Sequence, residues 1–257
     1  MALTTTVITE KGGAGKTTVT LGLASAAMAT GRHVLVVDMD PQGSATHWLG
    51  IEADQAAGAM VRALDAPKPG GARDELLVST WADHVHVMPA ARDLRAWEAT
   101  GNAKVRRLKL ARALKGVADA YPLVLIDAPP TLNDLAVNAL AAADRALLVT
   151  EPSALGISAI EPTADLVDEL WHSVNPGIDL AGVIVNRMPV WSTEADKQYD
   201  ELSRIVGRRS VWKPTIPQRV LLNQAAGDRR PIHSYGFRGT ELADIFDKLH
   251  RKLMKTA

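Results

Sequence analysis

The stretch EKGGAGKTT occupies residues 10–18, directly after a short apolar run at residues 6–8 and at the start of an alanine- and leucine-rich helical stretch at residues 17–30. Glycines let a backbone curl so that its N–H groups point inward, and the following helix N-terminus adds partial positive charge. This order therefore predicts a cradle for a polyphosphate. We expect Lys16 to reach the β- and γ-phosphates of a nucleotide and the Thr17 hydroxyl to ligate Mg²⁺.

Short runs of β-branched or aliphatic residues recur along the rest of the chain, and a second helical stretch lies at residues 105–118. Strands that are apolar on both faces and alternate with helices are typical of a doubly wound α/β fold, a mostly parallel sheet with helices on both faces. Ligands bind such sheets at the carboxyl ends of the strands. The further runs are residues 34–37, 85–88, 123–126, 146–149 and 182–185.

Size and composition limit the possible classes of protein. A chain of 257 residues with 47% apolar residues is large enough for one buried core, so we predict a single domain over residues 1–257. Its 29 basic and 29 acidic residues cancel, and any nucleic-acid binding must come from a local patch. The sequence has no cysteine, which excludes disulfides, thiolate metal sites and iron–sulfur clusters.

The amino terminus lacks the basic region and long apolar stretch of a secretory signal, and no later run approaches membrane-spanning length. We therefore expect a cytoplasmic protein with no stable membrane insertion.

Acidic residues follow the second and fourth apolar runs. Asp38 and Asp40 occupy alternate positions at one strand end, where one carboxylate can serve Mg²⁺ through water and the other can face an attacking water. Asp127 ends the run at residues 123–126, which is the Walker B arrangement of a carboxylate directed toward the metal shell. The predicted metal-side residues are thus Thr17, Asp38 and Asp127.

The glycine-rich loop departs from the ordinary P-loop pattern, because Glu10 stands where that pattern has glycine. With Lys11 ahead of the glycines, the loop resembles the deviant Walker A motif of the ParA/MinD family. Residues 38–43, DMDPQG, are similar to the switch I of that family, and residues 128–130, APP, to its switch II. The resemblance covers the chain from Val7 to a closing helix that begins near Thr240.

The resemblance implies a role for each matching residue. In the family, the signature lysine, here Lys11, crosses a dimer interface to the partner's nucleotide, and the second aspartate of switch I, here Asp40, promotes hydrolysis. Asn186 resembles the asparagine that contacts adenine, and Pro217 lies in a loop similar to the one that packs beside the base. The implied catalytic residues are Lys11, Lys16 and Asp40, and the implied ATP-binding residues are Lys11, Gly12, Gly13, Ala14, Gly15, Lys16, Thr17, Thr18, Asn186 and Pro217.

The resemblance also implies a function. It predicts an Mg²⁺-dependent ATP hydrolase whose ATP-bound homodimer binds DNA nonspecifically and is released when a ParB-like or cargo-adaptor protein stimulates hydrolysis. The cargo is a plasmid, a chromosome or a protein assembly, and the expected location is the nucleoid. Candidate DNA contacts are Arg106 and Arg107 with Lys109, Arg208 and Arg209, Arg219, Arg229 and Arg230, and His250, Arg251 and Lys252 with Lys255.

One alternative is a MinD-like ATPase that cycles on a membrane. The closing helix has apolar residues on one face with basic residues between them, as an interfacial helix has, although a helix that packs on the sheet has the same pattern. The apolar positions are Leu242, Ile245, Phe246, Leu249, Leu253 and Met254.

A second alternative class is a metabolic or redox enzyme built on the same nucleotide site. Nitrogenase-type iron proteins and the arsenite pump ATPase need cysteines, and dethiobiotin-synthetase-like ligases lack the combination of Lys11 with residues 40–43. A pseudo-ATPase is disfavoured because Lys16, Thr17, Asp40 and Asp127 are all present.

Overall fold

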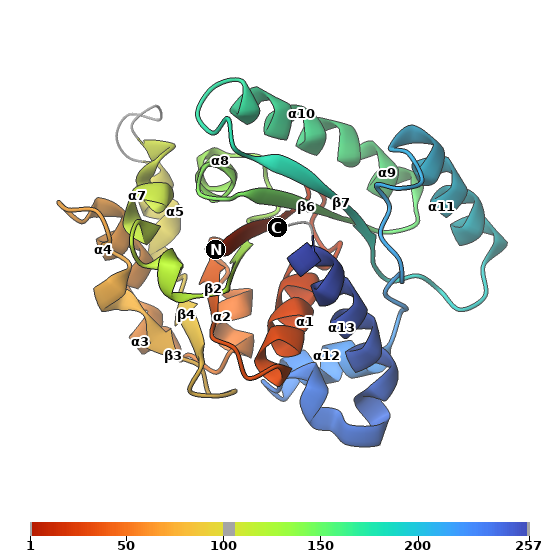
Figure 1. The fold of residues 1–257 in the computed structure, drawn as a ribbon, viewed down its shortest axis with the longest axis horizontal. Coiled ribbons are helices and arrows are strands. Elements are labelled where there is room, and N and C mark those ends of the chain that lie inside the picture. Colours follow the sequence, from red (N-terminus) through yellow and green to blue (C-terminus); the bar gives the residue numbers. More distant parts are fainter. Residues whose placement is uncertain (1, 100–105, 256–257) are drawn as a thin grey trace.

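The protein is described by a computed structural model that covers residues 2–99 and 106–255. A seven-stranded sheet forms its centre in the order β3-β4-β2-β5-β1-β6-β7 (Figure 1). Neighbouring strands are parallel except for β3 and β4. The strands are β1 Leu3–Ile8, β2 Val34–Asp38, β3 Leu77–Val78, β4 Val85–Met88, β5 Leu123–Asp127, β6 Arg145–Thr150 and β7 Asp179–Val185.

Helices cover both faces of the sheet, which confirms the predicted doubly wound fold. One buried apolar cluster lies between the sheet and the face of α4, α7, α8 and α10, and the other lies toward α1, α2, α12 and α13 (Figure 1). The α-helices are α1 Lys16–Ala29, α2 Ser44–Trp48, α3 Ala53–Ala56, α4 Ala59–Asp65, α5 Asp93–Glu98, α7 Lys109–Leu114, α8 Asp134–Ala141, α9 Ala154–Ser158, α10 Ile160–Trp171, α11 Thr193–Ile205, α12 Val220–Gly227 and α13 Thr240–Lys255; 3₁₀ turns are η1 Arg73–Glu75, η2 Ala118–Ala120 and η3 Ile232–Gly239.

Two elements differ from the sequence-based expectation. The helix predicted over residues 105–118 is the shorter α7, because Gly116 follows it with a φ of 72° and ends it in the left-handed region; residue 105 lies outside the described residues. Strand β3 was not predicted. It has only two residues, both at least partly exposed, and it pairs antiparallel at the sheet edge, so it shows no apolar run.

The closing helix α13 packs chiefly on α1 rather than directly on the sheet. Its apolar face is buried, with Leu242 2% exposed and Phe246, Leu249 and Leu253 fully buried. The Phe246 ring lies on Gly22 of α1, where an added Cβ would stand 2.1 Å from a ring carbon. The apolar face that a membrane-binding helix would need is therefore already used in the core.

In the two described ranges, none of the helices combines the length and the apolar composition that crossing a bilayer requires.

This packing predicts the effect of removing the Phe246 ring. We expect Phe246→Ala to lower the free energy of unfolding by about 3–5 kcal/mol, because the substitution leaves a cavity between α13 and α1. Urea denaturation followed by circular dichroism measures the change. The matched control is Phe237→Ala, since the Phe237 side chain is 97% exposed and its removal should change stability by less than about 0.5 kcal/mol. Equal losses in both variants would contradict the packing role.

Candidate nucleotide site

The glycine-rich loop joins the carboxyl end of β1 to α1. Gly13 and Gly15 have φ values of 82° and 91°, in the left-handed region that favours glycine. A Cβ on Gly15 would also stand 2.0 Å from the Asn186 amide nitrogen. The first turn of α1 has no acidic residue and no side-chain cap, so its N–H groups and the helix dipole face the loop. Gly12 and Ala14 complete the loop, and Thr17 and Thr18 begin the helix beside Lys16.

The side chain of Lys16 is folded over the loop. Its Nζ donates to the Thr9 carbonyl at 3.3 Å and to the Lys11 carbonyl at 3.4 Å, and the residue is only 7% exposed. Burial lowers the pKa of Lys16, and the negative charges of Asp127 and Asp40 act in the opposite direction. The loop therefore holds a cation at the mouth of its own backbone cradle, where a polyphosphate would offset the cost of burying it.

Two buried carboxylates face the start of α1. Asp127 accepts from the Thr17 hydroxyl at 2.6 Å and from the Thr20 hydroxyl at 3.0 Å. Asp38, its register partner on β2, accepts from the Thr46 backbone N–H at 2.8 Å and from the Thr46 hydroxyl at 2.7 Å. Burial raises the pKa of both carboxyls, and that of Asp38 is raised further by the charge of Asp127. A cation bound here would relieve the repulsion between the two acids.

Asp40 stands just beyond the strand end. It is partly exposed, its carboxylate accepts from the Gln42 N–H at 2.9 Å, and its charge acts on both Lys16 and Asp127. The three predicted acids therefore meet at one edge of the sheet.

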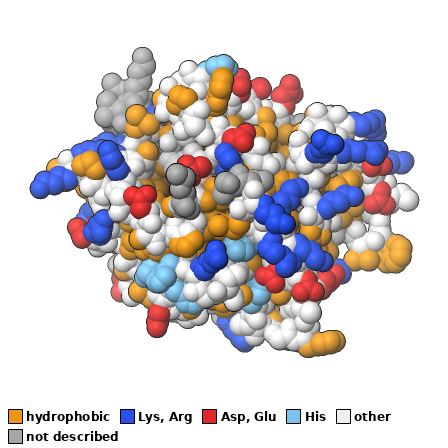
Figure 2. All heavy atoms as spheres, in the orientation of Figure 1, with side chains coloured by type: hydrophobic (Ala, Val, Ile, Leu, Met, Phe, Trp, Pro, Cys, Tyr) orange, Lys and Arg blue, Asp and Glu red, His pale blue; other side chains and the backbone are white. Residues whose placement is uncertain are grey.

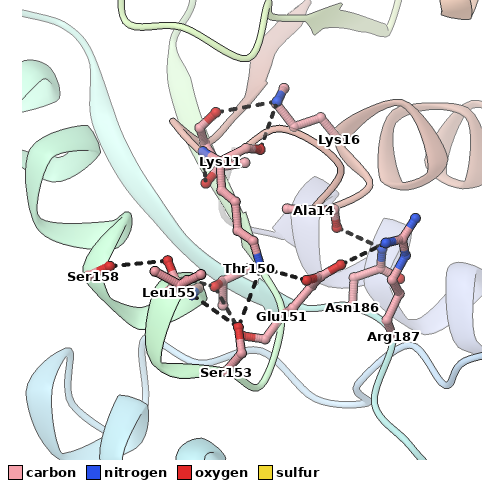
Figure 3. Close-up of polar contacts among 12 residues, drawn as sticks. Lys11, Ala14, Lys16, Thr150, Glu151, Ser153, Leu155, Ser158, Asn186 and Arg187 are labelled. Atoms are coloured by element: carbon pink, nitrogen blue, oxygen red, sulfur yellow. Dashed lines mark hydrogen bonds and ion pairs between the residues drawn. The ribbon is translucent and has the colours of Figure 1, made fainter.

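Lys11 extends away from Lys16, and the two side chains leave the loop in different directions (Figure 3). Its Nζ forms an ion pair with Glu151 at 2.7 Å and donates to the Ser153 hydroxyl at 3.4 Å. Glu151 follows the carboxyl end of β6 and also pairs with Arg187 at 2.8 Å. In the single chain, the cation of Lys11 is thus bound by its own protomer and lies outside the cradle.

Asn186 lies at the end of β7, beside the glycine-rich loop. Its amide nitrogen donates to the Ala14 carbonyl at 2.9 Å (Figure 3). The Asn186 Oδ1 atom is buried and has no hydrogen-bond partner. A buried acceptor left unpaired is costly, so this atom is suited to a ligand donor such as an amino group on a base.

A cavity of about 290 Å³ opens next to this asparagine. Pro217, the other predicted base contact, is a parallel bridge partner of Met188 and directly precedes Gln218 in the cavity wall. The cavity lies beside the first turn of α1 and between the chain after β7 and the start of α12. Its lining residues are Thr18, Asn186, Arg187, Gln218, Arg219, Leu222 and Asn223.

Comparison with known proteins identifies the family to which this chain belongs. The AAA domain family matches residues 3–180. The chromosome partitioning protein ParA of Myxococcus xanthus is 34% identical over 247 residues, which cover 96% of this chain and 86% of the relative. The chain belongs to the ParA/MinD family of ATPases.

Two solved structures share the fold of this ParA/MinD family member. Apo McdA from Cyanothece superposes with a TM-score of 0.85 at 21% identity, over 98% of this chain and 99% of that one. Cobyrinic acid a,c-diamide synthase from Mycobacterium smegmatis, with bound ADP and magnesium, gives a TM-score of 0.78 at 24% identity, over 100% of this chain and 97% of that one.

The sequence analysis missed two residues that the fold brings to the site of this ParA/MinD ATPase. Thr20 lies one turn after Lys16 and donates to Asp127, and Glu151 holds the signature lysine. A signal for Glu151 was available, because an acid that follows the apolar run at residues 146–149 obeys the same strand-end rule that identified Asp127. What the sequence lacked was the strand order, which places β6 next to β1.

Proposed function

We propose that this ParA-type ATPase hydrolyses ATP in an Mg²⁺-dependent reaction, and that its ATP-bound homodimer positions DNA or a protein cargo. The observation that supports this most directly is the convergence of Lys16, Thr17 and the acids Asp38, Asp40 and Asp127 at one sheet edge, with Lys11 directed away from that cluster. Lys11 thus lies outside its own cradle, and it can reach a second copy of the chain once its ion pair with Glu151 breaks.

The residues present fit a magnesium nucleotide. The loop N–H groups and Lys16 would hold the phosphates, and Thr17 with Asp127 and Asp38 would hold Mg²⁺. In the described part of the chain, no group of three His, Cys, Asp or Glu side chains is arranged to hold a metal ion. Mg²⁺ commonly takes only one or two carboxylates and completes its shell with phosphate oxygens and water. Bound there, it neutralises charge that develops on the phosphoryl group.

The hydrolytic role in this proposal falls to Asp40. Its carboxylate is partly exposed at the strand end, within the field of Lys16, and so it can accept a proton from the attacking water and orient that water. Asp38 is buried and bonded to Thr46, which suits it to the metal side of the site.

Exposed apolar side chains support a homodimer across this edge. Leu155 is 73% exposed and follows β6, and Val190 and Trp191 are 58% and 92% exposed and follow β7. All three therefore lie at the carboxyl ends of the strands, with the glycine-rich loop. A second protomer that covers this edge would bury them and bring its Lys11 to the nucleotide.

The cargo side of the proposal rests on family membership. The relative from Myxococcus xanthus is named a chromosome partitioning protein. This name supports binding to nonspecific DNA and a location on the nucleoid. It also supports a ParB-like or adaptor protein as the partner that stimulates hydrolysis. The MinD-like alternative is less favoured, because the apolar face of α13 is buried.

The central test uses the Asp40→Ala variant. We expect ATP turnover to fall by about 100-fold or more, with the ATP-bound dimer persisting, because the residue acts on the attacking water and not on binding. Phosphate release gives the rate, and light scattering with ATP or ADP gives the mass. Asp200→Ala removes an exposed acid of α11 and serves as the control.

A DNA retardation assay with ATP, with ADP and without nucleotide tests whether the ATP-bound protein binds DNA. The absence of an ATP-specific shift at low salt would contradict a function in DNA positioning.

A further inference from the structure

The Asp127 carboxylate is held on both of its oxygen atoms. Acidic and basic side chains are spread over the face of the molecule that Figure 2 shows, whereas Asp127 and Asp38 are fully buried on the neighbouring strands β5 and β2. The Thr17 hydroxyl donates to Asp127 Oδ2 at 2.6 Å, and the Thr20 hydroxyl donates to Oδ1 at 3.0 Å. The terminal torsion of an Asp side chain is soft, so one donor leaves the carboxylate plane free to rotate and two donors fix it.

Thr20 lies beneath the nucleotide cradle and not within it. Thr17 and Thr20 are three positions apart in α1, so they share one face of the helix. Thr17 is partly exposed beside the glycine-rich loop, whereas the side chain of Thr20 is fully buried one turn further along. The Thr20 hydroxyl therefore reaches the site through Asp127, and a nucleotide or its metal cannot contact it directly.

The Thr20 hydroxyl has two acceptors within reach. Besides Asp127 Oδ1, the Lys16 carbonyl lies 3.0 Å from its oxygen. A hydroxyl carries one hydrogen and can donate fully to only one acceptor. An ionised carboxylate is a stronger acceptor than a backbone carbonyl, so the hydrogen goes to Asp127 when that residue is charged.

A purely structural role would not need this second acceptor. Thr20 interrupts an apolar part of α1, between the fully buried Val19 and Leu21. Threonine has a lower helix propensity than alanine, and a buried hydroxyl must be hydrogen-bonded to avoid a desolvation cost. The Lys16 carbonyl alone would satisfy the hydroxyl. The additional contact with Asp127 instead gives the hydroxyl a place in the polar cluster of the site.

The second acid of the pair is held in a comparable way. Asp38 accepts from the backbone N–H and the hydroxyl of Thr46, and the negative charges of Asp38 and Asp127 act on each other. Like charges that close repel, so fixed donors are needed to hold both carboxylates in one arrangement. Thr46 holds Asp38 from the switch I side of the site, and Thr20 holds Asp127 from the helix side.

We propose that Thr20 is a positioning residue for the magnesium site, because its hydroxyl fixes the Asp127 carboxylate and, through it, the Thr17 hydroxyl. This inference rests on the proposed function, in which Thr17 and Asp127 serve Mg²⁺. Partners that hold a metal ligand in place typically contribute about 10- to 100-fold to metal affinity without touching the metal. Thr20 should therefore affect how strongly the metal supports nucleotide binding and leave the phosphate contacts of the loop unchanged.

The test measures the affinity of the full chain for fluorescently labelled ADP, with Mg²⁺ and in EDTA. The ratio of the two dissociation constants gives the contribution of the metal, and ADP avoids both hydrolysis and the ATP-dependent dimer. Thr20→Val keeps the shape of the side chain and removes the hydroxyl. We expect it to lower this ratio at least about tenfold while the affinity in EDTA stays close to that of the wild type, because Lys16 and the loop are intact.

Two further variants keep the outcome specific. Thr20→Ser retains the hydroxyl and should restore the ratio. Thr6→Val removes another fully buried hydroxyl, which donates to the Ala139 carbonyl at 2.7 Å, and should keep the wild-type ratio. Equal losses with Mg²⁺ and in EDTA, a loss that Thr20→Ser does not restore, or an equal loss in Thr6→Val would overturn the positioning role.

The wild type separates this inference from the proposed function. If Mg²⁺ does not strengthen ADP binding to the wild-type protein, the magnesium site itself is wrong and the role of Thr20 falls with it. If Mg²⁺ strengthens binding equally in the wild type and in Thr20→Val, the magnesium site stands and only the role of Thr20 is overturned.

Discussion

Lys16→Ala is expected to lose measurable ATP and ADP binding. The Lys16 ammonium is buried at the mouth of the glycine-rich loop, and removing one partner of a buried charge pair costs about 2–5 kcal/mol, which is a loss of roughly thirty- to several-thousandfold in affinity. Isothermal titration with each nucleotide and Mg²⁺ measures the change. The control is Lys197→Ala, which removes an exposed lysine of α11 and should bind as the wild type does.

The same variant separates binding from folding. In the empty protein, burial disfavours the charged form of Lys16, so its removal relieves a desolvation cost while Asp127 keeps its bonds from Thr17 and Thr20. We therefore expect the melting temperature of the empty variant to stay close to that of the wild type. Nucleotide should raise the melting temperature of the wild type only, since stabilisation follows ligand occupancy. A variant that nucleotide stabilises as strongly as the wild type would exclude Lys16 from phosphate binding.

The parts of this site that could be predicted from the sequence are those that follow from strand ends. Asp127, Asp38 and Lys16 each stand directly beyond, or one loop beyond, an apolar run, and parallel strands bring such positions to one edge regardless of their order. Their proximity could therefore be predicted without knowing which strands are neighbours in the sheet. Lys11 was found by its place in a motif, which gives a residue type and not the direction of a side chain.

Features that depend on lateral order or on local geometry could not be predicted. Glu151 reaches Lys11 because β6 lies next to β1, and the hydrogen bond from Asn186 to the Ala14 carbonyl exists because β7 follows β6 in the sheet. The sequence predicted α13 as an apolar-faced helix but could not identify α1 as its main contact.

Lys11→Ala is expected to retain nucleotide binding and to lose the ATP-dependent dimer. The Lys11 ammonium lies away from the cradle of its own chain, so the affinity of the monomer for ATP should change little (Figure 3). Close charge pairs across interfaces contribute about 1.5–7 kcal/mol, and a two-fold dimer would lose two of them, which weakens it by about a hundredfold or more. Light scattering with ATP against protein concentration measures this loss, and titration of ATP into the monomer supplies the control.

The ion pair with Glu151 is expected to control how readily Lys11 leaves its own protomer. The Lys11–Glu151 pair is partly buried, with side-chain exposures of 24% and 18%, and Lys11 must leave it before it can reach a partner's phosphate. Glu151→Gln keeps the shape of the side chain and weakens this competing pair, so we expect the variant to dimerise at lower ATP-bound protein concentration than the wild type. In the double variant with Lys11→Ala the gain should vanish, because the substitutions act through one pair. If the gain survives in the double variant, Glu151 acts through its ion pair with Arg187 and not through Lys11. If Glu151→Gln dimerises more weakly than the wild type, the carboxylate belongs to the interface and does not restrain Lys11.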